Sequence, residues 1–374
     1  MLAGWLQDFT AVGADPTGAS DSTAAVNAAF AVGSGFFPPG NYVLSGDVLI
    51  PSNRHILVMN GAIIINTGGR FTAHVPGGGN IHLEIDGTIG FLDTKTAPQM
   101  QDWPTSAQWG DERGLIEIGG SFQAPASNII VDGTGRVYSD YVWNGVPASV
   151  TNPHFQINRK GIAIWNAYRC LVSGLEVDHI YGEAVYFNGY ANNFDIRFQN
   201  NYVHDCAFNG LNFNVSQPYR GLYMNRNTVL RTMQGIEASG GTVEGNYIDT
   251  CNIGITFGAG AGILPSVLSN QVVSASNIGY SLQFAQLVQN INIIGNKAIS
   301  CGGPSYIVTN VQDFQFKNNS SYYHANAKPA PAYNITNTTS GGHLDGNITS
   351  TSGAHSTGGF VNSGANVVGT NPVF

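Results

Sequence analysis

A short pattern recurs along the middle of the chain about every 24 residues. Its clearest copies are LEVDHIYGEAVYFNG from Leu175 and NYVHDCAFNGLNFNV from Asn201, and further copies begin at Asn227, Asn246, Asn270, Asn296 and Asn319. A repeat of this length is typical of a solenoid, in which each coil packs only on its neighbours and the core grows lengthwise. The chain of 374 residues is therefore predicted to form one solenoid domain, 1–374, although length alone would suggest two or three domains.

Within each copy, short stretches of alternating apolar residues are separated by Asn and Gly. Alternation with a period of two is typical of strands, and Asn and Gly accept the left-handed backbone that tight corners need. The pattern predicts an all-β fold, a right-handed single-stranded parallel β-helix with three sheets. Most of its asparagines are predicted to bond to one another along the axis, as ladders.

Aligning the copies predicts which side chains of one sheet point outward. Val185 and Phe187 begin two apolar columns that point inward, so the side chains between them point outward: Tyr186, Asn212, Glu237 and Thr256. Nearer the start of the same strands lies a second polar set: Lys160, Glu183, Asn209 and Gln234. One face of one sheet is thus predicted to gather ionisable side chains that a chain of this composition uses sparingly.

The composition limits the partners of the chain. Charged residues make up only 10%, against about 25% in ordinary soluble domains, which predicts a neutral polar surface suited to bind uncharged hydroxyl groups. The net charge of −8 and only 15 Lys plus Arg argue against nucleic acid. There is no apolar run of about 18 residues to span a membrane, and 1–9 lack the pattern of a signal peptide.

The four cysteines are Cys170, Cys206, Cys251 and Cys301. The repeat places Cys206 and Cys251 in one column, two coils apart, which at about 4.8 Å per coil separates their Cα atoms by roughly 9–10 Å. A disulfide needs Cα atoms within about 7 Å of each other. The cysteines are therefore predicted to be buried free thiols.

An amphipathic α-helix is predicted over 20–30, with Ser20 or Asp21 as its N-cap and an apolar face of Ala25, Ala29 and Phe30. Because a solenoid needs a cover over its open apolar end, this helix is expected to cap the N-terminal end.

The stretch DFTAVGADPTGASDSTAAVNAAF, followed by GFFPPGNYVLSG, spans 8–46 and resembles the opening of the pectate-lyase-like β-helix superfamily. It is most similar to phage and prophage tailspike-type polysaccharide depolymerases. The resemblance implies the fold, a polysaccharide partner, and an extracellular or virion-tail location, and it is compatible with a homotrimer. The resemblance carries over no catalytic residues, because the superfamily includes lyases, hydrolases, epimerases and transferases. The GHG, RIK and NTD tripeptides of polygalacturonases are absent, which argues against that subfamily. Coils fill 47–339, and the Gly/Ser/Thr-rich end, 340–374, forms final coils or a strap.

Two insertions, 91–113 and 138–160, interrupt the coils and lead into strands predicted to be neighbours. Their aromatic residues are suited to stack on sugar rings, since loops on a rigid scaffold commonly carry function. With polar residues of the adjacent coils they form the predicted substrate-binding set: Trp103, Trp109, Trp143, His154, Arg159, Asn209, Asn212 and Arg231.

Two chemistries fit the ionisable groups beside these insertions. Hydrolysis of a glycosidic bond needs two carboxyl groups, for which Glu183 is the predicted acid, Glu237 the base and Asp205 the reserve. A lyase needs a base to remove a proton beside a uronate, and the candidates are Lys160, Tyr186 and His179, with Arg159 or Arg231 neutralising the uronate. Hydrolysis is the leading hypothesis.

A third hypothesis is a non-catalytic adhesin that binds glycans. Reducing ends would identify a hydrolase, an unsaturated sugar a lyase, and neither product an adhesin. The linear spacing of His and Cys matches no zinc motif, so no metal site is predicted, and no cofactor except calcium in the case of a uronate substrate.

Overall fold

The computed structural model describes residues 6–92, 114–146, 160–189, 194–215, 220–258, 265–323, 332–336, 342–351, 360–362 and 367–368. The chain divides into two compact units: the first comprises 1–144 and 153–208, and the second comprises 145–152 and 209–374. One solenoid domain over 1–374 stays a prediction. Of the predicted substrate-binding residues, four lie outside the described residues: Trp103, Trp109, His154 and Arg159.

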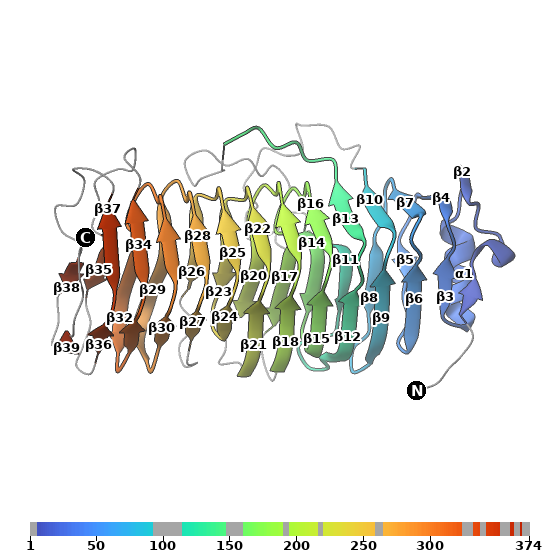
Figure 1. Ribbon diagram of the computed structural model, residues 1–374. Coiled ribbons are helices and arrows are strands. Elements are labelled where there is room, and N and C mark those ends of the chain that lie inside the picture. Colours follow the sequence, from blue (N-terminus) through green and yellow to red (C-terminus); the bar gives the residue numbers. More distant parts are fainter. Residues whose placement is uncertain are drawn as a thin grey trace. The chain divides into compact units, whose positions relative to one another are not determined.

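The first unit is built from three parallel sheets, and successive strands of the chain visit them in turn (Figure 1). Its sheet A consists of β1 (Gln7–Asp8), β3 (Gly35–Phe37), β6 (Arg54–Val58), β9 (Gly79–Ile85), β12 (Ala126–Asp132), β15 (Ala167–Ser173) and β18 (Phe194–Gln199). Its sheet B consists of β2 (Thr17–Asp21), β4 (Gly40–Leu44), β7 (Ala62–Asn66), β10 (Thr88–Phe91), β13 (Arg136–Ser139), β16 (Glu176–Asp178) and β19 (Tyr202–His204). Its sheet C consists of β5 (Val48–Leu49), β8 (Phe71–His74), β11 (Gly114–Gly119), β14 (Lys160–Trp165) and β17 (Val185–Gly189).

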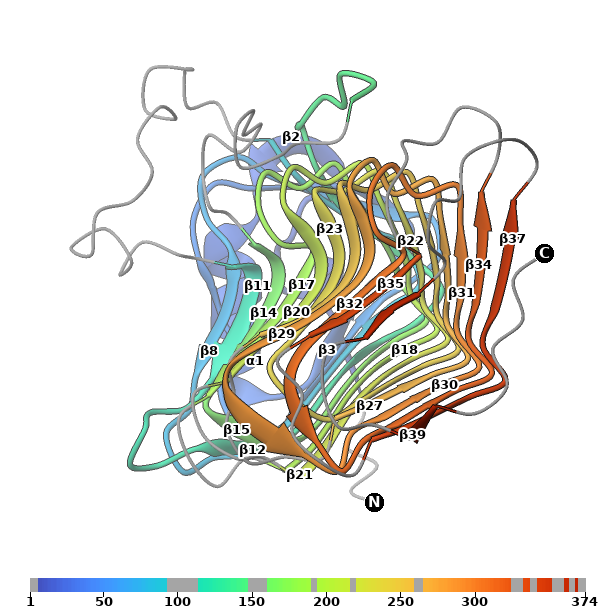
Figure 2. The same cartoon turned by 90° about the vertical axis from the view of Figure 1, so that its left-hand side faces the viewer.

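The second unit follows the same plan, and Figure 2 shows its three sheets around a common interior. Its sheet A consists of β21 (Arg220–Asn225), β24 (Thr242–Glu244), β27 (Ser266–Leu268), β30 (Asn292–Ile294), β33 (Gln315–Lys317), β36 (His343–Asp345) and β39 (Val367–Val368). Its sheet B consists of β22 (Thr228–Leu230), β25 (Tyr247–Asp249), β28 (Gln271–Val273), β31 (Lys297–Ile299), β34 (Ser320–Tyr323) and β37 (Ile348–Thr351). Its sheet C consists of β20 (Asn209–Val215), β23 (Gln234–Ala238), β26 (Ile253–Phe257), β29 (Ile278–Gln289), β32 (Tyr306–Gln312), β35 (Tyr333–Thr336) and β38 (Phe360–Asn362).

The strand register confirms the columns predicted from the repeat. In the first unit Ala163 pairs with Tyr186, between the inward pairs Ile162–Val185 and Ile164–Phe187. In the second unit the same pattern gives an inward column of Leu211, Ile236 and Ile255 beside the polar column of Asn212, Glu237 and Thr256. The fold is the right-handed parallel β-helix that the sequence predicts.

The predicted asparagine ladder runs through the interior of the second unit. Each buried side-chain amide donates to the carbonyl oxygen of the next asparagine, at 2.9–3.1 Å, along Asn227, Asn246, Asn270, Asn296, Asn319 and Asn347. The amide of Asn270 also donates to the carbonyl oxygen of Val243, at 2.8 Å. The ladder therefore satisfies backbone groups at corners where the strands end.

A single α-helix among the described residues, α1 (Thr23–Val32), lies at the N-terminal end of the first unit (Figure 1). Its residue Phe30 packs edge-on against Phe9, with ring centroids 5.0 Å apart, and the side chain of Asn27 bonds to the backbone of Leu49 in edge strand β5. The helix thus covers both the apolar end and an unpaired strand edge, as a cap must.

The start of α1 and one member of its apolar face differ from the prediction. Asp21 ends β2, because its carboxylate accepts hydrogen bonds from the backbone amides of Thr23 and Ser45, both at 3.0 Å. The N-cap is therefore Ser22, and the buried face is Val26, Ala29 and Phe30 rather than one including Ala25.

The four cysteines are buried and free, which confirms the prediction. Burial raises the pKa of the Cys251 thiol to about 11 and that of the Cys301 thiol to about 12, because an apolar interior disfavours the thiolate. In the described part of the chain, no helix has the length and apolar character needed to cross a membrane.

Candidate functional site

Four successive segments that follow the sheet B strands β10, β13, β16 and β19 of the first unit form what we call the B-to-C edge, and their described residues in that unit are 92, 140–144, 179–184 and 205–208. The first two segments begin the long insertions, which lead into β11 and β14, and these strands pair directly through Ile116 and Ile162 (Figure 1). The prediction that both insertions lead into neighbouring strands of one sheet is confirmed. Within the described part of the second insertion, Trp143 is half-buried.

A buried ion pair lies at the start of two neighbouring strands of this edge. Lys160 begins β14, and Glu183 precedes β17. The backbone carbonyl of Glu183 accepts a hydrogen bond from the backbone amide of Gly161 at 2.9 Å. The Nζ of Lys160 is 3.1 Å from Oε2 of Glu183, with side-chain exposures of 0% and 5%. The Nζ also lies 4.2 Å from the ring centroid of Tyr186, in a cation–π contact.

Tyr186 joins this pair to two further side chains. Its hydroxyl accepts a hydrogen bond from Nδ2 of Asn188 at 2.8 Å, and its ring packs edge-on against Trp165 at 5.2 Å. Trp165 was not among the predicted site residues. It lies two positions after Ala163 on the same strand, so the alternation that identified the outward column would have found it.

A second group of charges lies where the strands of sheet B end. The buried carboxylate of Asp178 accepts two hydrogen bonds from the guanidinium of Arg136, from Nε at 2.7 Å and from Nη2 at 2.5 Å. The same carboxylate contacts Nδ1 of His179. Asp178 is thus held by an imidazole of its own coil and by the guanidinium of Arg136 from the preceding coil.

In the next coil, His204 lies between two carboxylates. Its Nδ1 is 2.6 Å from Oδ2 of Asp205, and its Nε2 is 3.0 Å from Oε1 of Glu176. The imidazole of His204 thus links the carboxylates of Asp205 and Glu176.

Tyr141 adds a buried hydroxyl beside this second group. Burial, with smaller contributions from Cys206 and Asp205, raises the pKa of Tyr141 to about 12. Its ring packs edge-on against Tyr181, with centroids 5.5 Å apart. Among the described residues its hydroxyl has no hydrogen-bond partner.

The remaining predicted residues belong to the second unit. Glu237 accepts hydrogen bonds from Nδ2 of Asn209 at 2.5 Å and from Nδ2 of Asn212 at 3.4 Å. Arg231 follows β22 with a left-handed backbone, φ 53°. The pairing of Glu183 with Glu237 joins residues of different units and stays a prediction.

Asp178, His179 and His204 have ligand atoms within 4.8 Å of one another. The spacing of residues within one segment does not indicate this group, because its members come from two coils. The guanidinium of Arg136 already engages both carboxylate oxygens of Asp178, which leaves that carboxylate poorly suited to bind a metal ion.

No family model and no curated protein sequence matches the chain. Several solved structures share its fold, each at low sequence identity. The family 28 exopolygalacturonase of Yersinia enterocolitica aligns over 98% of this chain and 78% of its own, at 13% identity and a TM-score of 0.62. The tailspike protein of E. coli bacteriophage HK620, solved with a pentasaccharide, aligns over 98% and 64%, at 12% identity and a TM-score of 0.60.

The A-module of a mannuronan C-5 epimerase of Azotobacter vinelandii aligns over 98% of this chain and 99% of its own, at 13% identity and a TM-score of 0.53. These structures confirm the parallel β-helix fold that the resemblance of residues 8–46 implies. At such identity the likeness concerns the fold, and the roles of the site residues have to be argued from their own chemistry.

Proposed function

We propose that this protein is a polysaccharide depolymerase that hydrolyses glycosidic bonds of a bacterial exopolysaccharide or capsule at the B-to-C edge of the first unit. The neutral, polar composition supports a carbohydrate substrate, since charged residues are only 10% of the chain. An exopolygalacturonase and a tailspike protein solved with a pentasaccharide share the fold, which supports the same substrate class.

The observation that carries the proposal is the buried ion pair of Lys160 and Glu183. A buried pair stabilises a fold little or not at all compared with apolar side chains of similar volume, because both charges lose their hydration. This pair nevertheless lies at the start of two neighbouring strands in a chain with few charges. Ionisable groups held in such places are characteristic of catalytic sites.

The solvent exposures of the Lys160 and Glu183 side chains indicate which of the two contacts the substrate. Glu183 keeps 5% of its side chain exposed and Lys160 none, so Glu183 is the member that can contact a substrate. In the proposed step, Glu183 takes a proton from Lys160, 3.1 Å away, and donates it to the glycosidic oxygen as the bond to the leaving sugar breaks. Lys160 is a positioning residue, and the proton that the attacking water releases to the second carboxylate returns to the pair through solvent after the sugar leaves.

Hydrolysis also needs a second carboxylate to act on water or on the sugar carbon. Asp205, on the same edge, and Glu237, of the second unit, are the candidates for this role. The amides of Asn209 and Asn212 that donate to Glu237 would hold its carboxylate in one orientation. Arg231, Trp143 and the residues of the two insertions are proposed to contact the sugar chain.

A lyase is the second candidate, and one observation favours it. The hydroxyl of Tyr186 accepts a hydrogen bond from Asn188, and its ring lies against the cation of Lys160. Both contacts would stabilise a phenolate able to remove a proton beside a uronate carboxylate, with calcium available to neutralise that carboxylate. His179 would be the alternative base.

Incubation with a panel of neutral and uronate-containing bacterial polysaccharides tests the proposal. We expect reducing ends to appear without the ultraviolet absorbance of an unsaturated uronate. Equal growth of both signals would identify a lyase. Retention of a polysaccharide without either signal would identify a glycan-binding adhesin and overturn the proposal. An extracellular or virion-tail location, and a homotrimer, belong to the same proposal.

A further inference from the structure

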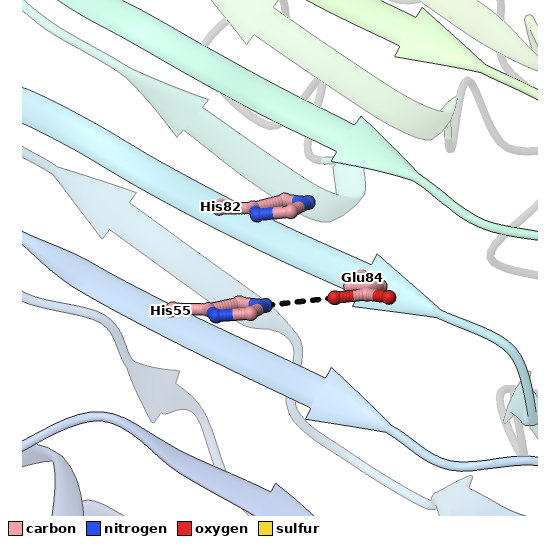
Figure 3. Close-up of side chains that lie close together, drawn as sticks. All are labelled: His55, His82 and Glu84. Carbon is pink, nitrogen blue, oxygen red and sulfur yellow. Dashed lines mark hydrogen bonds and ion pairs between the residues drawn. The ribbon is translucent and has the colours of Figure 1, made fainter. Parts of the chain in front are cut away.

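Two histidines and a glutamate lie together on sheet A of the first unit. His55 in β6 and His82 in β9 are partners in the strand register, and Glu84 follows two positions after His82 on the same strand. The imidazole rings are stacked in parallel, with centroids 4.4 Å apart and an angle of 3° between their planes. Figure 3 shows the two rings one above the other, with Glu84 opposite the edge of His55.

Each imidazole is hydrogen-bonded to a carboxylate. Nε2 of His55 is 2.9 Å from Oε2 of Glu84, and Nε2 of His82 is 2.7 Å from Oδ1 of Asp132 in β12. The four side chains are 32–36% exposed, so they are accessible from solvent and only partly fixed by packing. None of them belongs to the B-to-C edge.

We infer that His55, His82 and Glu84 form a binding site for a divalent transition-metal ion of the zinc class. Their ligand atoms lie within 4.8 Å of one another. Two ligand atoms of one tetrahedral zinc ion are about 3.3 Å apart, given bonds of about 2.0–2.2 Å. His55 and Glu84, at 2.9 Å, already approach that separation, and a ligand atom of the partly exposed His82 lies within 4.8 Å of both.

The chemistry of the group suits this class of ion. Imidazole nitrogens prefer zinc and its neighbours over calcium or magnesium, and one carboxylate completes a set of three ligands with a position left for water. The carboxylates of Glu84 and Asp132, beside the two rings, together balance a charge of +2.

Asp132 has a separate role in this arrangement. Histidines that ligate metals are usually held by a carboxylate that is not itself a ligand, and removal of that carboxylate weakens metal binding about 10–100-fold. Asp132, at 2.7 Å from His82, can orient the ring in this way. The group is not continued in the next coil, where the register partner of His82 is Ile130.

Titration calorimetry of the full chain with zinc chloride, after removal of metals with a chelator, tests the inference. We expect His55→Ala and His82→Ala each to abolish the binding of one zinc ion per chain, and Asp132→Asn to weaken that binding at least tenfold. His74→Ala, which removes an exposed histidine of β8 in the same unit, should leave it unchanged. Calcium chloride should not compete for the site.

Unchanged zinc binding in both His55→Ala and His82→Ala would overturn the inference. So would loss of the same ion in His179→Ala, which would place it at the B-to-C edge. The thermal melting of each variant without zinc serves as the folding control, and because the substituted side chains are about one-third exposed we expect it to match the parent. Zinc binding that is lost without the histidines and that calcium does not compete for cannot come from glutamate or aspartate side chains alone.

Discussion

Six successive turns from sheet B to sheet C, in the two units, share one backbone feature and carry different side chains. The first residue after the sheet B strand is left-handed, with φ between 53° and 56°, at His179, Asp205, Arg231, Thr250, Ser274 and Ser300. A strained conformation at one place would hint at function, but one that recurs in successive coils is part of the fold. The turn is therefore common scaffold, and only the side chains it carries differ.

The side chains of these turns differ in kind between the two units. After Arg231, the second unit has Thr250, Ser274 and Ser300 at this turn position, and its buried asparagines repeat from coil to coil. Tyr280, Tyr306 and Tyr333, for example, stack at 4.6 and 5.1 Å, and each hydroxyl donates to backbone carbonyls. The first unit instead holds charged contacts that occur once. Polar features that repeat hold the coils together, and those that do not repeat are candidates for chemistry.

The largest effect is expected from breaking the ion pair of the first unit. Lys160→Met should lower the free energy of unfolding by about 3–5 kcal/mol, because it leaves the carboxylate of Glu183 buried without its cation. The double variant Lys160→Met with Glu183→Leu should recover most of the loss while remaining inactive. Urea denaturation of both proteins checks this. A single variant as stable as the parent would mean that the pair is not a buried charge pair in solution.

The next effect concerns activity. Glu183→Gln should lower the rate of polysaccharide cleavage at least about 100-fold, the low end of the contribution of a general acid, and leave substrate binding nearly intact. Glu244→Gln, a change at an exposed residue of the second unit, is the matched control and should cleave like the parent. Equal rates in the parent and Glu183→Gln would remove Glu183 from the proposed mechanism.

A smaller loss is expected from a repeated group. Asn270→Ala should lower the free energy of unfolding by about 1–3 kcal/mol for each buried group it leaves unsatisfied, and should not change the rate per folded molecule. Asn252→Ala, which removes an exposed contact to Ser276 in the same unit, should change stability by less than about 0.5 kcal/mol. Denaturation and cleavage assays on the two variants separate structure from chemistry.

The smallest expected effect concerns how the free energy of unfolding depends on pH. The folded-state pKa of Cys251 is raised to about 11, so above about pH 8.5 the unfolded chain loses that proton first and stability falls as pH rises. The decrease should be about 1.4 kcal/mol per pH unit for each such thiol, until the pH reaches the folded-state pKa. Cys251→Ala should make the slope shallower by that amount, measured under reducing conditions, whereas a parallel slope would place the thiol in contact with water.

The repeat explains how much of this could be predicted. Strand pairing is set by aligned copies, so the columns of Tyr186 and Glu237 followed directly from the sequence. The capping helix was expected, but its start was not, because the carboxylate of Asp21 bonds to Ser45, a residue 24 positions away.

The contacts of the site were harder to predict than its location. The alignment placed Lys160 and Glu183 in one column, but their burial depends on packing that no linear pattern encodes. The pairing of Arg136 with Asp178 joins residues 42 positions apart, and His55 and His82 lie in early coils, where the repeat is weak. Side chains that contact one another from different coils form no motif with a fixed spacing within one segment of the sequence.

The asparagine ladder has a consequence for how such a chain can change in evolution. Each asparagine needs only a like residue on either side, so a duplicated segment such as 246–269 would restore every bond that its insertion interrupts. The second unit can therefore gain or lose whole coils while its buried asparagines keep the same hydrogen bonds. The number of coils in the second unit can therefore change in evolution without altering the ionisable groups of the first unit.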